Sequence, residues 1–213
     1  MKSILVIGAG KFGHYFCRHL LKKNCEVMIV DGEEEKLSDM LSYVSSAKVG
    51  DCTRRDVVES LGVDDFDEIV VCIPGDFQNS LQVVDLLREC GAKRITAVAS
   101  TDIQSKFLHK NGADTVIFPD HDMAERFAVS IADDTVFDYM KLSDNYGIYE
   151  ITPPKRWHGQ TVLSVDVRRK FNINIIAIKT PNAHLLIPTP DYVFNGSDHL
   201  MIFCKDSAVD KLR

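Results

Sequence analysis

The sequence lacks any long apolar run. No stretch approaches the roughly 20 consecutive apolar residues that span a bilayer, and Met1-Lys2-Ser3 leads directly into a strand-like segment rather than into a signal peptide. The chain has 213 residues, of which 45% are hydrophobic and 26% are charged, and this ordinary globular composition excludes a largely disordered protein. These features predict a soluble, cytoplasmic protein.

Clustered positive charge is also absent. The formal net charge is -6, and the Lys and Arg residues form no group large enough to make a phosphate-binding face. The sequence therefore predicts that nucleic acid is not a partner.

Recognisable catalytic and metal-binding motifs are missing as well. The six cysteines show no C-x-x-C spacing, and the seven histidines show no H-E-x-x-H spacing. The sequence has no G-x-S-x-G elbow, no Walker-type phosphate loop and no Tyr-x-x-x-Lys pair. These absences argue against zinc enzymes, serine hydrolases, P-loop nucleotidases and short-chain dehydrogenases.

One glycine-rich motif is present near the amino terminus. The residues Gly8, Ala9, Gly10, Lys11, Phe12 and Gly13 follow the apolar run Ile4–Ile7 and precede a stretch with helical apolar spacing. A G-x-G-x-x-G sequence in such a strand-to-helix turn removes side chains where a pyrophosphate must approach, and it directs backbone N–H groups at that group. The motif predicts a nucleotide site.

An acidic residue follows at the expected distance. Cys25–Val30 is typical of a second strand, and Asp31 comes directly after it, followed by Gly32. A carboxylate about 20 residues beyond the glycines binds ribose hydroxyls and repels a 2′-phosphate, which disfavours NADP. Separate structural roles, with the glycines allowing close packing and Asp31 capping a helix, would explain each residue but not their combined order.

Short apolar runs then alternate with amphipathic segments, which indicates a parallel sheet wound with helices. The expected strands after Asp31 are 47–50, 68–73, 94–98 and 115–118. With the first two runs they make an α/β, Rossmann-like doubly wound sheet, and ligands bind such sheets at the carboxyl ends of the strands.

That rule adds further candidate residues to the site. Asp51 and Cys52 follow the third strand. Asp51 is expected either to hold the adenine edge or to cap the next helix. Lys11 is expected either to contact phosphate or to lie in solvent. The remaining candidates, at the end of the fourth strand, are Cys72, Ile73, Pro74, Gly75 and Gln78.

From Pro119 the sequence predicts two amphipathic helices rich in large apolar residues, which indicate a dimerisation arm. The second of these is expected as a helical linker over 134–145, between a nucleotide-binding domain over 1–133 and a small α+β domain over 146–213. Closure of the same domain by these helices is the alternative.

Six strings together resemble the RCK, or KTN, regulatory subunits of Trk/Ktr-type potassium uptake systems. They are the segment from Val6 to Gly13, Gly50-Asp51-Cys52-Thr53, Gly112-Ala113-Asp114, Pro119 with the following helix around Met123, the segment from Asp166 to Lys179, and Asn195-Gly196-Ser197-Asp198. The resemblance covers essentially the whole chain and rests on the order and spacing of the strings.

The resemblance implies a subunit without enzymatic activity, located at the inner face of the membrane. It implies a homodimer that assembles into an octameric ring on an integral-membrane potassium transporter, where an adenine nucleotide, ATP/ADP or NAD/NADH, controls conductance. It also implies Mg²⁺ or another divalent cation near Asp120, although Lys11 and Val98 stand where ATP-responsive members carry arginine and lysine. Cyclic di-AMP would bind between paired carboxyl-terminal domains, through Arg168, Arg169, Asn172, Asn174, His184 and Pro190.

Two other functions remain open on the sequence. The main alternative is an NAD-dependent oxidoreductase with a small substrate domain, which would need a proton donor such as His158, His184 or His199. The other is a redox sensor that uses Cys52 and Cys72 beside bound NADH.

Overall fold

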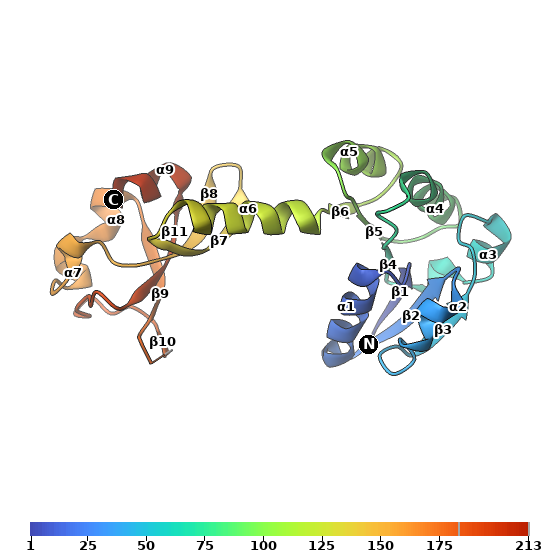
Figure 1. Cartoon of the computed structure of the whole chain (residues 1–213), viewed down its shortest axis with the longest axis horizontal. Coiled ribbons are helices and arrows are strands. Elements are labelled where there is room, and N and C mark those ends of the chain that lie inside the picture. Colours follow the sequence, from blue (N-terminus) through green and yellow to red (C-terminus); the bar gives the residue numbers. More distant parts are fainter. Residues whose placement is uncertain (183, 213) are drawn as a thin grey trace. The chain divides into compact units, whose positions relative to one another are not determined.

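The computed structural model describes residues 1–182 and 184–212. The chain divides into two compact units, Met1–His121 and Asp122–Arg213. Each unit has its own sheet (Figure 1). Each also has its own apolar core.

The first unit contains a six-stranded parallel sheet with the strand order β3-β2-β1-β4-β5-β6. This order confirms the predicted doubly wound sheet and places its switch point between β1 and β4. The strands are β1 Lys2–Ile7, β2 Cys25–Asp31, β3 Ser46–Val49, β4 Glu68–Val71, β5 Ile95–Val98 and β6 Thr115–Ile117.

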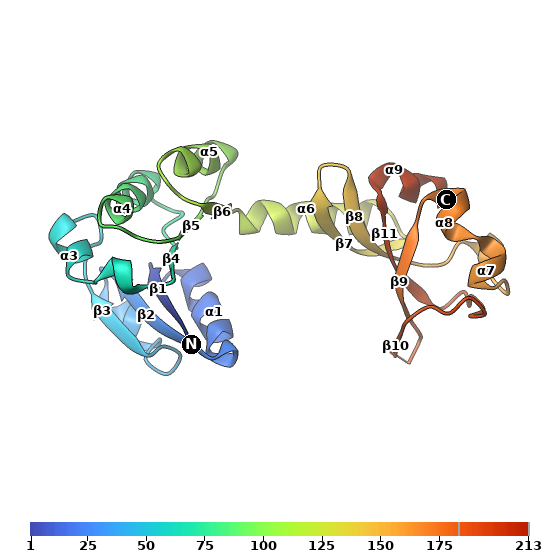
Figure 2. The ribbon, with the colours of Figure 1, turned by 180° about the vertical axis from the view of Figure 1, so that it is seen from behind.

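Helices cover both faces of this sheet. Buried residues of α1 and α2 pack on one face, and buried residues of α3, α4 and α5 pack on the other. In both ribbon views α4 and α5 lie side by side (Figures 1 and 2). The helical segments of this unit are α1 Lys11–Leu20, η1 Leu21–Lys23, α2 Glu34–Ser38, α3 Arg55–Glu59, η2 Val63–Asp65, α4 Phe77–Glu89 and α5 Asp102–Lys110.

The first helix approaches the sheet so closely that two positions require glycine. Gly8 has a φ of +104°, and a Cβ there would lie 2.5 Å from the carbonyl oxygen of Cys72. A Cβ on Gly13 would lie 2.2 Å from the carbonyl oxygen of Gly8. The helix therefore starts directly above the end of β1, where its free N–H groups face the switch point.

The second unit is built on a five-stranded antiparallel sheet with the order β10-β9-β11-β8-β7. One face carries an apolar core that includes Trp157, Ile178 and Phe194, and α7, α8 and α9 contribute residues to it. The strands are β7 Val136–Ser143, β8 Tyr146–Ile151, β9 Asn174–Lys179, β10 Leu185–Leu186 and β11 His199–Lys205. The helical segments are α6 Pro119–Ala132, which crosses the unit boundary, η3 Lys155–Trp157, α7 Val162–Val165, α8 Val167–Phe171, α9 Asp206–Val209 and η4 Asp210–Leu212. The predicted small α+β domain is confirmed.

The prediction of a helical linker over 134–145 is wrong. The helix α6 ends at Ala132, and Val136–Ser143 is a strand that pairs with β8. Ser143 pairs with Tyr146, so Asp144 and Asn145 form a two-residue hairpin loop. The aromatic side chains of Phe137 and Tyr139 favour this strand, and Asp144 and Asn145 are residue types that favour the tight turn after it.

Among the described residues, no helix combines the length and the apolar character that a membrane crossing demands.

An ionic cluster lies on three neighbouring strands of the second unit. The Oε1 atom of Glu150 accepts a hydrogen bond from Nζ of Lys179 at 3.0 Å and lies 2.7 Å from Nδ1 of His199. The ring of Phe137 lies 4.0 Å from that of His199. Burial acts to raise the pKa of Glu150, but the hydrogen bonds of His199 and Lys179 outweigh it and hold the pKa below its ordinary value.

We expect Gly13→Ala to lower the free energy of unfolding by about 1–3 kcal/mol, because the new methyl group meets the backbone at Gly8 and forces α1 away from the sheet. Chemical denaturation measures this loss. Gly10→Ala is the matched control, since a Cβ there meets nothing within 4 Å, and it should cost less than about 1 kcal/mol. Equal losses in the two variants would contradict the packing argument.

We expect Glu150→Gln to destabilise the chain at neutral pH and to lose this effect in acid. A carboxyl group with a depressed pKa stabilises the folded state above its unfolded-state pKa, here 4.5, and this stabilisation disappears as the pH falls through the folded-state value. The difference in Tm between wild type and variant should therefore be a few degrees at pH 7 and should shrink below about pH 4.5. A difference independent of pH would show that the charge of Glu150 has no part in the cluster.

Candidate functional site

The amino-terminal end of α1 is the first component of the site. The helix has ten residues, its N-cap is Gly10, no side chain caps it, and its first turn contains no acidic residue. The N–H of Gly8 is already used, because it donates to the carbonyl oxygen of Val30 at 2.8 Å. The helix start therefore offers free backbone donors and a positive dipole end, which suit a phosphate group.

The carboxylate of Asp31 joins two loops at this point. Its Oδ2 atom accepts a hydrogen bond from the backbone N–H of Ala9 at 2.7 Å, and Oδ1 accepts one from the N–H of Glu33 at 2.9 Å. Each carboxylate oxygen keeps a further lone pair. The group can therefore hold the glycine turn in place and accept hydrogen bonds from ribose hydroxyls.

A hollow opens over the carboxyl ends of β1 to β4, and it brings together ten of the predicted site residues. These are Gly8, Gly10, Asp31, Gly32, Asp51, Cys52, Cys72, Ile73, Pro74 and Gly75. Thr53, Asp76 and Asn79 also line this first hollow, and they belong to the two loops that the sequence placed at the ends of the third and fourth strands. Glu33 and Lys36 line it too, and they were not predicted from the sequence.

Asp51 forms a local turn rather than a helix cap. Its Oδ1 atom accepts hydrogen bonds from the hydroxyl of Thr53 at 2.7 Å and from the Thr53 N–H at 3.0 Å. These two bonds lower the pKa of Asp51. The N-cap of α3 is Arg54, so the expected capping role is wrong, and the carboxylate remains at the rim of the first hollow.

The two cysteines of the first hollow are buried thiols. Burial, helped by the nearby carboxylates of Asp51 and Asp31, raises the pKa of Cys52 to about 12. Burial also raises the pKa of Cys72 well above its ordinary value. Because the thiolate is the reactive form, these thiols are poor candidates for redox sensing, and their small apolar side chains instead line the hollow.

Lys36 places a positive charge in the first hollow, on the short helix α2 that follows Asp31. Its Nζ atom donates a hydrogen bond to Oε1 of Glu33 at 2.6 Å. That bond raises the pKa of Lys36, and the charge of Asp31 raises it further. The sequence signal for these two residues was weak, because charged residues in the first turns of a short exposed helix are also typical of a solvated surface.

A second hollow lies on the other side of the glycine turn, at the ends of β5 and β6. It shares Gly10, Cys72 and Pro74 with the first hollow. Its other lining residues are Lys11, Phe12, Tyr15, Val98, Ala99, Ser100, Pro119 and Asp120. The predicted residues Lys11, Phe12 and Asp120 therefore lie together, and Ser100 is a polar residue here that the sequence did not reveal.

Three predicted residues line neither hollow. Ala9 takes part through its backbone N–H, which Asp31 binds. Gly13 serves the close packing of α1. Gln78 lies in the first turn of α4, and its side chain is not among those that line either hollow.

The described part of the chain contains no group of three or more His, Cys, Asp or Glu side chains placed to hold a metal ion. Asp120 therefore belongs to no such group among these residues, and a divalent ion there would draw further oxygen ligands from a bound molecule.

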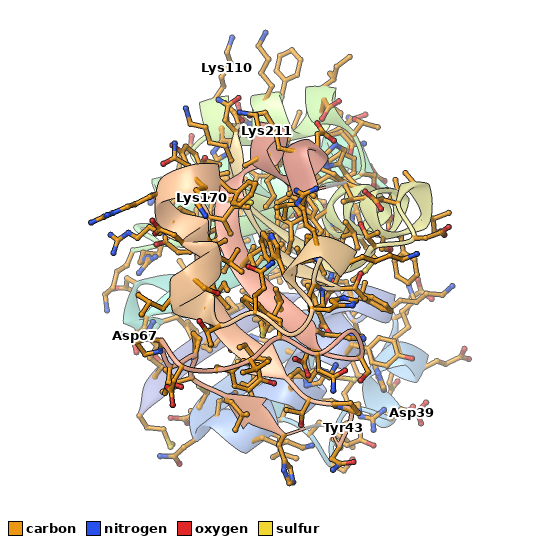
Figure 3. The ribbon with its side chains drawn as sticks, turned by 90° about the vertical axis from the view of Figure 1, so that its left-hand side faces the viewer. Asp39, Tyr43, Asp67, Lys110, Lys170 and Lys211 are labelled. Carbon is orange, nitrogen blue, oxygen red and sulfur yellow. The ribbon has the colours of Figure 1, made fainter. Side chains whose placement is uncertain are left out.

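The second unit has a hollow of its own. It lies beside α7, α8 and β9, and it contains Arg168, Asn174 and Pro190 of the residues expected to contact cyclic di-AMP. Arg169, Asn172 and His184 do not line it. Its apolar walls include Leu163, Val167 and Ile175, whereas Lys170 lies at the surface on α8 (Figure 3).

Known proteins resemble the chain along nearly its whole length. A model of the TrkA-N domain matches residues 4–119, and a model of the TrkA-C domain matches residues 147–213. Ktr system potassium uptake protein C of Bacillus subtilis (strain 168) is 36% identical over 201 residues, which cover 94% of this chain and 91% of that protein. Ktr system potassium uptake protein A of the same organism is 33% identical over 201 residues, with 94% and 90% coverage.

Solved structures agree with this at the level of the fold. The GsuK channel bound to NAD superposes with a TM-score of 0.70 at 19% identity, over 99% of this chain and 38% of that chain. The two domain models and the relatives above 30% identity lead to one conclusion: the chain belongs to the family of TrkA-N and TrkA-C domain proteins that includes the Ktr potassium uptake proteins.

Proposed function

We propose that this protein is a nucleotide-binding regulatory subunit of a membrane potassium uptake system, located in the cytoplasm and without enzymatic activity. The observation that carries the proposal is the alignment of nearly the whole chain with two potassium uptake proteins. The site supports it, because the geometry of the first hollow suits an adenine nucleotide. The described lining of the two hollows contains no histidine that could act as a proton donor.

The nucleotide is an adenine nucleotide, either ATP/ADP or NAD/NADH. Its ribose would lie against Asp31, its adenine edge beside Asp51, and its diphosphate at the start of α1, where Gly10 leaves the backbone open. The GsuK channel, which shares the fold, is known with NAD bound. The second hollow would receive whatever extends beyond the second phosphate, and Asp120 would contact a divalent cation only together with ligand oxygens.

Nucleotide binding would act on the transporter by shifting a conformational equilibrium. A ligand moves such an equilibrium only by the difference between its affinities for the two states. Exchange of one nucleotide for another at the same site therefore changes conductance when the two ligands favour different states.

A homodimer, assembled further into an octameric ring, would multiply this difference over several subunits. The helix α6 supports an interface between copies, because it exposes Met123, Phe127 and Ile131 at four-residue spacing, with Phe127 59% and Ile131 78% exposed. Large apolar side chains in one stripe favour burial against another surface. The described strands and helices of the second unit leave this stripe uncovered within one chain.

Cyclic di-AMP is a candidate second ligand for the hollow beside α8 and β9. Arg168 supplies a cation for a phosphate, Asn174 supplies hydrogen bonds, and Pro190 supplies an apolar wall. Paired second units would place two such hollows near each other, as the two-fold symmetry of this ligand requires.

We expect Asp31→Asn to weaken adenine nucleotide binding at least tenfold, because the ribose hydroxyls lose a charged acceptor. Thermal unfolding with ATP, ADP, NAD or NADH measures this effect, since a ligand at 100 times its Kd stabilises the folded state by about 2.7 kcal/mol. Glu35→Gln, an exposed acidic residue outside the hollow, is the control and should retain the wild-type shift. A wild-type chain that none of the nucleotides stabilises would contradict the proposed function, as would rapid consumption of NADH with a metabolite.

We expect Arg168→Ala to abolish most of any stabilisation by cyclic di-AMP while leaving the response to ADP intact, because the two ligands bind different units. Arg169→Ala provides a matched control, since its neighbouring side chain does not line the hollow. Calorimetric titration of both variants measures the difference. Equal losses in the two variants would show that this hollow is not the binding site.

A further inference from the structure

Ser100 connects the two loops that form the far wall of the site. It follows β5, and its hydroxyl donates a hydrogen bond to the carbonyl oxygen of Pro74, which follows β4, at 3.2 Å. Pro74 lines both hollows, whereas Ser100 lines the second. The hydroxyl therefore lies on the wall of the second hollow, bonded to a residue that the two hollows share.

The backbone of Ser100 is fixed by its neighbours. Its N–H donates to Oε1 of Gln104 at 2.8 Å, and the N–H of Gln104 donates to Oγ1 of Thr101 at 3.2 Å. Thr101 is the N-cap of α5. This reciprocal arrangement holds the main chain at the end of β5, so the direction of the Ser100 hydroxyl depends on Pro74.

A serine hydroxyl has a single proton and two lone pairs. Because the proton of Ser100 is used by Pro74, its oxygen offers only acceptor capacity to the second hollow. The carboxylate of Asp120 is likewise an acceptor, and Lys11 is the one cation among the described lining residues. The remaining walls are apolar or aromatic and come from Phe12, Tyr15 and Val98, with Ala99 and Pro119.

The walls of the second hollow thus suit a flat ring carried on a hydroxylated sugar better than a third phosphate. Ribose hydroxyls donate hydrogen bonds to Ser100 and Asp120, and aromatic and aliphatic side chains pack against a ring. A phosphate oxygen is only an acceptor at neutral pH, so Lys11 alone would attract it, whereas the lone pairs of Ser100 and the negative charge of Asp120 would oppose it.

We propose that Ser100 is a specificity-determining residue that favours the second nucleoside of a dinucleotide over the third phosphate of a nucleoside triphosphate. This inference rests on the proposed function, since it requires that an adenine nucleotide occupies the first hollow. A ligand that ends at the second phosphate does not reach Ser100 and serves as the internal reference.

Calorimetric titration of the full-length chain with NAD, ATP and ADP tests the proposal. We expect Ser100→Ala to weaken NAD binding about two- to tenfold, the effect of one lost neutral hydrogen bond, while ADP affinity stays unchanged and ATP affinity is unchanged or higher. Ser100→Ala also removes the hydrogen bond to Pro74, but it does so in the free protein and in both complexes. The free-energy cost of losing that bond therefore cancels from the ratio of NAD to ADP affinity.

Two further variants separate specificity from a structural effect. Ser100→Thr keeps the hydroxyl and should restore the wild-type ratio of NAD to ADP affinity. Ser105→Ala, on the helix α5 that follows Ser100 and outside both hollows, should leave all three affinities unchanged.

The outcomes are distinguishable. If Ser100→Ala weakens NAD, ATP and ADP alike, or changes none of them, Ser100 has no role in specificity and the inference is wrong, although the proposed function stands. If the wild-type chain binds none of the three nucleotides, the proposed function and the inference are both wrong.

Discussion

The contact on which the site depends is the pair of hydrogen bonds that Asp31 accepts from the backbone. One oxygen holds Ala9 in the glycine turn and the other holds Glu33 in the next loop. A charged acceptor makes stronger hydrogen bonds than a neutral one, so a single carboxylate sets the distance between the glycine turn and the loop that follows β2 in the first hollow. The geometry is therefore established before a ligand arrives, which lowers the ordering cost of binding.

Steric limits around the glycine turn complete this preorganisation. The positions 8 and 13 have no room for a Cβ, whereas position 10 is open. The same six-residue motif thus contains two different requirements, one for packing and one for ligand access. A motif search treats the three glycines alike, and only the structure separates them.

The sequence predicted the first unit well because its signals are local and periodic: apolar strands, amphipathic helices and glycine turns recur in a fixed order. It failed at Val136–Ser143, where large apolar residues suggested a helix and the short Asp144-Asn145 turn was overlooked. It could not settle Asp51, because an Asx turn and a helix cap use the same residue types. It also missed Ser100 and Lys36. Ser100 contacts a second loop through Pro74, and Lys36 interacts with the charges of neighbouring carboxylates. Motif spacing predicts neither kind of contact.

The apolar stripe on α6 has a consequence for the supply of the protein in the cell. If a second copy covers this stripe, a newly synthesised monomer exposes these apolar side chains and is susceptible to proteolysis and aggregation. In the assembled protein the same side chains are buried. Because dimerisation depends on concentration, the amount of assembled protein then rises more steeply than the rate of synthesis. Modest changes in expression would accordingly be amplified before any ligand is bound.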